Sequence, residues 1–61
     1  MITSRQLFNQ FKIRIKRQTA NIEGYNSMKE VAKQYDYILS KRHLRKIIKL
    51  IDKEIIRLKN Q

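Results

Sequence analysis

The chain has 61 residues, of which 15 are lysine or arginine and 5 are aspartate or glutamate, so its formal net charge at pH 7 is +10. With no cysteine and one histidine, the composition excludes a disulfide framework, thiolate chemistry and a zinc site. Residues 1–61 are expected to form a single small basic domain of marginal stability, since such short chains bury only about 60% of their unfolded surface. A partner or a homodimer would add stability.

The first amphipathic segment is predicted to be a helix over about residues 4–20. Thr3 followed by Gln6 has the form of a capping box, in which two side chains satisfy free amides at a helix start. The predicted apolar stripe contains Leu7, Phe8, Phe11 and Ile15. The basic residues expected to point outward are Arg5, Lys12, Lys16 and Arg17. Ile13 would be exposed on this helix.

Residues 11–16 also allow interpretation as a strand, because apolar and basic residues alternate there. The chain has no second alternating segment, so such a strand would pair only with another copy. Two paired copies would resemble a ribbon-helix-helix repressor, with Lys12, Arg14 and Lys16 reading the major groove. The polar stretch that follows weighs against this, because that family passes directly from ribbon to helix.

A break is predicted within residues 21–26, because the only glycine, Gly24, lies there among turn-forming residues. Ser27 and Glu30 repeat the capping-box spacing and predict a second helix over about residues 28–38. Its expected inward residues are Met28, Val31, Ala32, Tyr35 and Leu39. An alternative joins the first two segments into one long bent helix, because near-heptad apolar spacing continues through both.

The third helix is predicted over about residues 41–59, with Ser40 as its N-cap. Apolar residues spaced three and four apart form one stripe: Leu44, Ile47, Ile48, Ile51, Ile55 and Leu58. The far side carries Arg42, Arg45, Lys46, Lys49, Lys53 and Arg57. The three segments together predict an all-α fold, a small three-helix domain with helices at about 4–20, 28–38 and 41–59.

The row of like charges on the third helix favours an anionic partner, since each like-charged pair weakens a helix by about 0.2–0.5 kcal/mol. Glu54 with Arg57, and Lys49 with Asp52, are expected to relieve part of the repulsion. The remaining charge is predicted to lie along phosphates without reading bases. The predicted nucleic-acid-binding residues are Lys41, Arg42, Arg45, Lys46, Lys49, Lys53, Arg57, Lys12, Lys16 and Arg17.

A helix-turn-helix is a second interpretation of the last two helices, in which the N-terminal residues of the second helix enter the major groove. The residues that would meet DNA are Lys41, Arg42, His43, Arg45, Lys46 and Lys49. Asp36 stands where that motif usually has a glycine, which weighs against it. Tyr37 is the one tyrosine away from core spacing, and a single tyrosine makes no stacking platform.

Residues 27–58 resemble the Hha family of small nucleoid-associated modulators. The resemblance rests on Val31, Tyr37, Leu39, Ser40, Leu44, Asp52 and Leu58. It implies docking onto a DNA-bound partner protein and transcriptional silencing. The acidic residues of that family are mostly lysine or arginine in this chain, so the prediction of function does not rest on the resemblance.

The sequence therefore predicts a non-enzymatic protein that binds nucleic acid, DNA rather than RNA, or a DNA-bound protein, as an accessory factor in transcription or recombination. Five scattered carboxylates, one histidine and no glycine-rich loop provide no catalytic, metal or cofactor site. The alternative is a cationic amphipathic membrane-active peptide or a small basic immunity-type protein. The absence of tryptophan and the mean hydropathy of −0.68 weigh against a membrane, so the expected location is cytoplasmic and nucleoid-associated.

Overall fold

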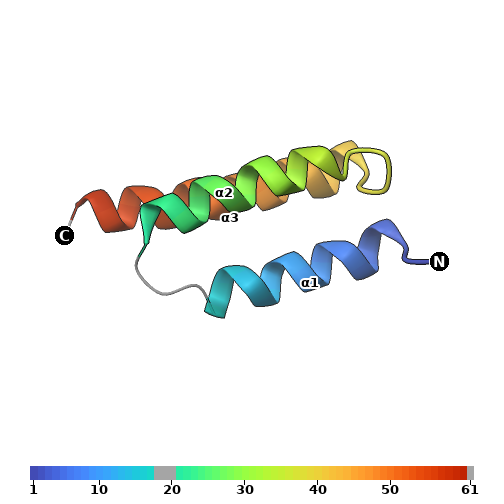
Figure 1. Ribbon diagram of the computed structural model, residues 1–61, viewed down its shortest axis with the longest axis horizontal. Coiled ribbons are helices and arrows are strands. Elements are labelled where there is room, and N and C mark those ends of the chain that lie inside the picture. Colours follow the sequence, from blue (N-terminus) through green and yellow to red (C-terminus); the bar gives the residue numbers. More distant parts are fainter. Residues whose placement is uncertain (18–20, 61) are drawn as a thin grey trace.

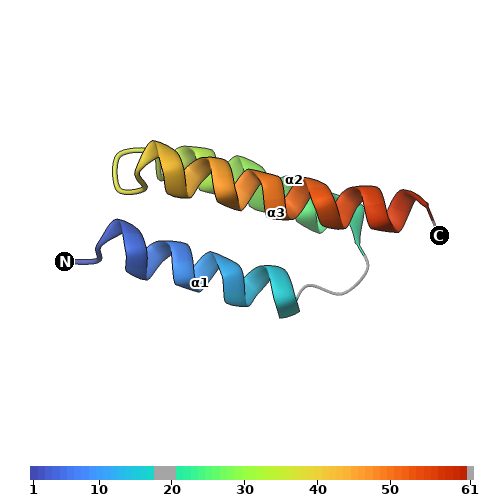
Figure 2. The same cartoon turned by 180° about the vertical axis from the view of Figure 1, so that it is seen from behind.

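A computed structural model of the chain describes residues 1–17 and 21–60. Within them the chain forms three helices, α1 (Ser4–Arg17), α2 (Ile22–Gln34) and α3 (Lys41–Lys59). Consecutive helices run in opposite directions, so α1 and α3 are parallel and α2 is antiparallel to both (Figures 1 and 2). The domain measures 39 × 18 × 15 Å, and α3 packs on both α1 and α2. The predicted all-α, three-helix fold is confirmed.

The capping box at the start of α1 forms as predicted. The Thr3 N–H donates to Gln6 Oε1 at 3.0 Å, and the Gln6 N–H donates to Thr3 Oγ1 at 3.1 Å. Residues 11–16 lie inside this helix, so the strand interpretation is wrong. The helix is favoured because its apolar stripe packs against the other helices of the same chain, whereas a strand would have to pair with a second copy. Ile13 is left 51% exposed as a result.

The predicted start of the second helix near residue 28 is wrong, because α2 begins at Ile22. Asn21 is the N-cap, with an extended backbone, and its side chain accepts a hydrogen bond from the Gly24 N–H at 3.2 Å. Asparagine caps a helix as well as serine does. Starting the helix at Ile22 also places Tyr25, which is 1% exposed, in the core. The alternative of one long bent helix is wrong, because the backbone at Asn21 is extended.

The helix ends also differ from the prediction. α1 is described to Arg17, and its predicted continuation to residue 20 falls outside the described residues. α2 ends at Gln34, not near residue 38. The chain then turns, with the Leu39 N–H donating to the Tyr35 carbonyl at 2.8 Å, and this turn reverses the chain into α3. The predicted third helix, from Lys41 to Lys59, is confirmed.

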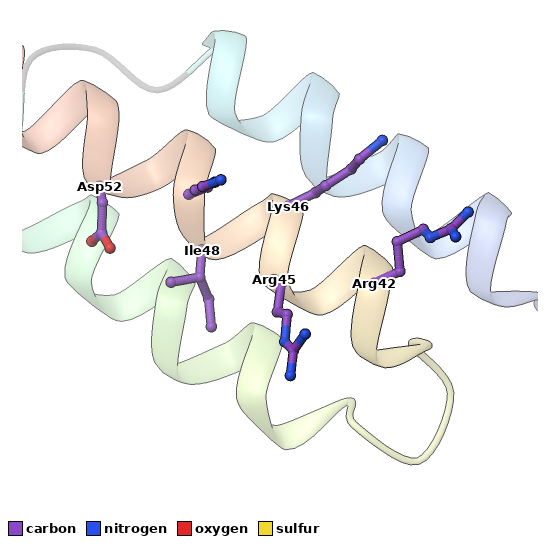
Figure 3. A pocket seen from close by; sticks show the side chains of 6 residues that line it. Arg42, Arg45, Lys46, Ile48 and Asp52 are labelled. Carbon is purple, nitrogen blue, oxygen red and sulfur yellow. The ribbon is translucent and has the colours of Figure 1, made fainter.

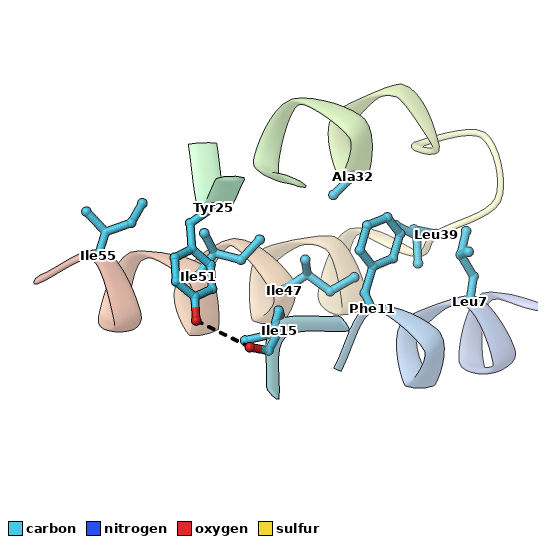
Figure 4. Packing of buried hydrophobic residues seen from close by; sticks show 9 residues of the cluster. All are labelled: Leu7, Phe11, Ile15, Tyr25, Ala32, Leu39, Ile47, Ile51 and Ile55. Carbon is cyan, nitrogen blue, oxygen red and sulfur yellow. Dashed lines mark hydrogen bonds between the residues drawn. The ribbon is translucent and has the colours of Figure 1, made fainter. Parts of the chain in front are cut away.

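The core is formed by apolar residues from all three helices and the α2–α3 turn (Figure 4). The buried members are Leu7, Phe11, Ile15, Tyr25, Ala32, Leu39, Ile47, Ile51 and Ile55. Ala32 is fully buried, and its small side chain allows a close approach between helices. The Tyr25 hydroxyl donates to the Ile15 carbonyl at 3.3 Å, which ties α2 to the C-terminal end of α1. The predicted stripes thus pack together, with Phe8, Met28, Val31, Tyr35, Leu44 and Leu58 partly buried at the edge of the core.

A polar junction fixes the N-terminal end of α1 against the start of α3. The Ser40 side chain caps α3 by accepting from the His43 N–H at 3.2 Å, as predicted. Ser4 Oγ accepts from the Ser40 N–H at 2.8 Å and lies 2.6 Å from His43 Nδ1. The Phe8 ring stacks on the His43 ring with their centroids 4.7 Å apart. The two helices are therefore held in register at this end.

Replacing Ile51 by alanine should destabilise the domain by about 2–5 kcal/mol, because this fully buried side chain would leave a cavity among three helices. A loss of that size would unfold most of so small a domain. Urea titration followed by circular dichroism measures the effect. The matched control is Ile56→Ala on the same helix, which is 59% exposed and should change stability by less than about 0.5 kcal/mol. Equal losses in the two variants would contradict this core.

Candidate nucleic-acid interface

The outward face of α3 carries the predicted cations in one exposed row. We call Arg42, Arg45, Lys46, Lys49, Lys53 and Arg57 the α3 basic face; all six are exposed. At a rise of about 1.5 Å per residue, this face is about 22 Å long. Its side chains spread to both sides of the helix axis, since Arg42 and Lys46 point toward α1 and Arg45 points toward α2 (Figure 3).

A shallow hollow of about 560 Å³ lies among these spread side chains. Ile48 and Asp52 complete its lining on the side of α2 (Figure 3). Cations in such a row reinforce one another's potential, so an anion approaching the row is attracted along most of its length.

Ion pairs neutralise little of the α3 basic face. Within residues 1–17 and 21–60, Arg57 is its one member in an ion pair, with Nε donating to Glu54 Oε2 at 2.8 Å. The hydrogen bond and the negative charge of Glu54 raise the pKa of Arg57 above its ordinary value. The Glu54–Arg57 pair was predicted from its spacing.

The predicted pairing of Lys49 with Asp52 is wrong. Asp52 instead accepts from Lys29 of α2, with Nζ and Oδ1 2.6 Å apart. The side chain of Lys29 is 23% exposed and that of Asp52 is 47% exposed, so this contact is more shielded from water than a pair on the outer surface. Because Asp52 is turned toward α2, the charge of Lys49 stays available on the α3 basic face.

Two basic residues of α1 extend this surface sideways. Lys12 and Lys16 face α3 across two adjoining hollows of about 480 and 360 Å³. Lys12, Leu50 and Lys53 line both hollows, which therefore form one continuous depression, the α1–α3 groove. Its lining consists of Phe8, Lys12, Ile15, Lys16, Lys46, Lys49, Leu50, Lys53, Glu54 and Arg57.

Two predicted site residues do not join this surface. Arg17 lies with Arg14 on the side of α1 that faces α2, where both line a hollow with Met28 and other α2 residues. Lys41 is exposed in the first turn of α3 but lines neither the α1–α3 groove nor the hollow on the outer face of α3. The spacing of the residues along one helix does not reveal which side of α1 meets α3.

The helix-turn-helix interpretation is wrong, because α2 and α3 lie antiparallel along one another (Figure 1). The helices of that motif cross at about 90–120°, so that the start of the second helix projects into the groove. Here the start of α3 is held against α1 through Ser40 and His43, which contact Ser4 and Phe8. His43 is half-buried against Phe8 and lies 2.6 Å from Ser4 Oγ, so its ring is directed toward α1 and not toward DNA as that interpretation requires.

Leu50 lines the α1–α3 groove, which its position in the sequence did not predict. It is 37% exposed and lies between the lysines of α1 and α3, although it falls outside the predicted apolar stripe. Its spacing from Lys46 and Lys53, four and three residues away, places Leu50 on the same side of the helix as these lysines and could have indicated this position. Tyr37 is 75% exposed, as its spacing indicated, while Tyr25 is buried and Tyr35 is half-buried.

Comparisons with known proteins returned no match among protein-family models, curated proteins or solved structures. None of the helices in the described part of the chain has the length and apolar composition needed to cross a bilayer. Among the same residues, no three or more histidine, cysteine, aspartate or glutamate side chains gather as a metal site would require.

Replacing Glu54 by glutamine should strengthen binding to duplex DNA about two- to fivefold at moderate salt, because Arg57 would lose its carboxylate partner. The slope of log affinity against log salt should steepen by about 0.9 if Arg57 gains one phosphate contact. Mobility shifts at several salt concentrations measure both quantities. The matched control is Glu30→Gln on α2, which removes the same charge from an ion pair with Lys33, where Nζ and Oε1 are 3.6 Å apart. This control should raise DNA affinity less than Glu54→Gln does. Equal gains would show that net charge alone sets the affinity.

Proposed function

We propose that this protein binds duplex DNA through the phosphate backbone, using the α3 basic face extended by Lys12 and Lys16, as a regulatory or accessory factor in transcription or recombination. The observation that carries the proposal is the exposure of Arg42, Arg45, Lys46, Lys49 and Lys53 on one side of a helix, none in an ion pair within the described residues. Binding of this kind would keep the protein at the nucleoid.

The dimensions of the face suit a phosphate track. Each strand of a DNA duplex has one phosphate per about 3.4 Å of duplex axis, so a face about 22 Å long extends past about six phosphates of one strand. Arginines on this face can hold a phosphate through two parallel hydrogen bonds, while the lysines act as point charges. The face presents no motif for reading bases, which supports binding with little sequence preference.

The charge distribution supports a single binding side. Residues 40–61 contain eight basic and two acidic residues, whereas residues 21–39 contain two basic and three acidic residues. The acidic residues Glu23 and Glu30 are exposed on α2, and the two lysines of α2, Lys29 and Lys33, are both in ion pairs. A polyanion is therefore attracted to α3 and α1 rather than to α2.

Log affinity for DNA should fall with log salt concentration at a slope near −5, the value for about six neutralised phosphates. Fluorescence anisotropy with a labelled duplex, titrated at several salt concentrations, measures this slope. A slope near zero would eliminate the phosphate mechanism. A single-stranded RNA of equal length is the comparison that tests the preference for DNA.

Changing Arg42, Lys46, Lys49 and Lys53 together to glutamate should abolish DNA binding and leave the fold intact, because all four side chains are exposed. The matched control changes Arg5, Arg14, Arg17 and Lys59, four exposed cations outside the α3 basic face, to glutamate. Both variants therefore have a net charge of +2 instead of +10. The control should retain part of its DNA affinity. Equal loss in both variants would mean that no particular face is used.

The membrane-active alternative is tested with the same variants. Leu50 and Ile56 are exposed beside the cations of α3, as they would be on a helix that lies on an anionic bilayer. The DNA-binding proposal expects a cooperative helical unfolding transition in plain buffer. Two results together would favour the membrane alternative. The protein would become helical only when anionic vesicles are added, and the fourfold glutamate variant of α3 would lose vesicle binding while keeping DNA binding.

A further inference from the structure

The α1–α3 groove differs from the rest of the basic surface because its floor is apolar. Phe8, Ile15 and Leu50 form this floor, and Leu50 is the member most open to solvent at 37%. Lysines stand along both sides, with Lys12 and Lys16 on α1 and Lys46, Lys49 and Lys53 on α3. The groove therefore offers apolar contact along its centre and positive charge along both edges.

A nucleic-acid strand matches this groove poorly. Phosphates placed along its centre would lie over the aliphatic side chains of Ile15 and Leu50, where they would lose hydration without gaining a partner. Bases would need an aromatic surface on which to stack. Phe8 does not supply one, because His43 stacks on it at 4.7 Å and the Lys12 ammonium lies 5.4 Å from its ring centroid.

We propose that the α1–α3 groove docks an acidic amphipathic helix of a partner protein. The apolar stripe of such a helix would lie on the floor formed by Phe8, Ile15 and Leu50. Aspartate and glutamate flanking that stripe would meet the lysines on the two edges. This is the helix-in-groove mode of recognition, in which residues at i, i+3, i+4 and i+7 anchor the bound helix.

The length of the groove sets the length of the docked segment. From Lys46 to Arg57 the groove extends about 16 Å along α3, which corresponds to about three helical turns of the partner. Glu54 and Arg57 close one end as an ion pair. The positive edges exclude a second copy of this chain as the occupant, because its net charge is also +10.

The probe that tests this surface is a synthetic helical peptide of about 18 residues. This length is chosen because isolated helices shorter than about 12–15 residues are only marginally stable in water. Its leucines are placed at i, i+3, i+4 and i+7, and glutamates flank them. The control peptide has the same composition in an order that leaves no apolar face. We expect the amphipathic peptide to bind at least about tenfold more tightly than the control by fluorescence anisotropy. Equal affinities would overturn the proposal, because charge alone would then explain the binding.

Neutral substitutions separate this surface from the DNA-binding face. Leu50→Gln should weaken peptide binding about tenfold, whereas Ile56→Gln, on the same helix but outside the groove lining, should change it less than about twofold. Neither substitution alters the charge, so both should leave DNA affinity within about twofold. Unchanged peptide binding by Leu50→Gln would overturn the proposal. The peptide assay contains no DNA, so its outcome is independent of the proposed DNA binding.

A second measurement uses the unaltered protein, in case Leu50→Gln affects the fold. Chemical-shift mapping with the amphipathic peptide should place the largest changes at Phe8, Ile15 and Leu50. Changes centred on Arg45 and Ile56 would place the peptide on the outer face of α3 and overturn the proposal. Because Lys46, Lys49 and Lys53 belong to both surfaces, a DNA duplex added to the complex should displace the peptide.

Discussion

Burial of the apolar stripe of α3 sets both the packing of the three helices and the position of the cations on α3. Ile47 and Ile51 are inaccessible to solvent and Ile55 is nearly so, and they contact the apolar sides of α1 and α2. An amphipathic helix that buries one side must expose the other, so packing places the cations of α3 in one outward row. The same contact that folds the domain therefore creates the α3 basic face, which we propose binds DNA.

This arrangement has an electrostatic cost. With a net charge of +10 on so small a domain, the lysine and arginine side chains repel one another, which favours expanded states over the compact fold. Three ion pairs among residues 1–17 and 21–60 offset this repulsion. Two of them, Glu54–Arg57 and Glu30–Lys33, lie within single helices at the surface, where a pair contributes about 0–1 kcal/mol. An anionic ligand would remove more of the repulsion than these pairs do, so binding and folding are expected to reinforce each other.

The surface is divided by chemistry as well as by position. The outer side of α3 presents charge to solvent, which suits a regular array of phosphates. The α1–α3 groove adds Leu50 and Phe8 between two sets of lysines, which suits a ligand with both carboxylates and apolar side chains. Lys46, Lys49 and Lys53 serve both surfaces, so the two ligands would compete rather than bind side by side.

The helical class, the capping box at the start of α1 and the extent of α3 follow from local sequence alone, because a continuous apolar stripe and a polar cap are local features. The second predicted capping box, Ser27 with Glu30, is wrong, because both residues lie inside α2. The predicted start of α2 after Ser27 was wrong because Asn21 is an equally good cap, and the earlier start buries Tyr25. The ion pair of Asp52 with Lys29, in place of the predicted pair with Lys49, depends on the packing of α2 against α3. Residue spacing along one helix cannot predict a partner that lies on another helix. For the same reason, only the packing of α1 on α3 decided which basic residues of α1 join those of α3.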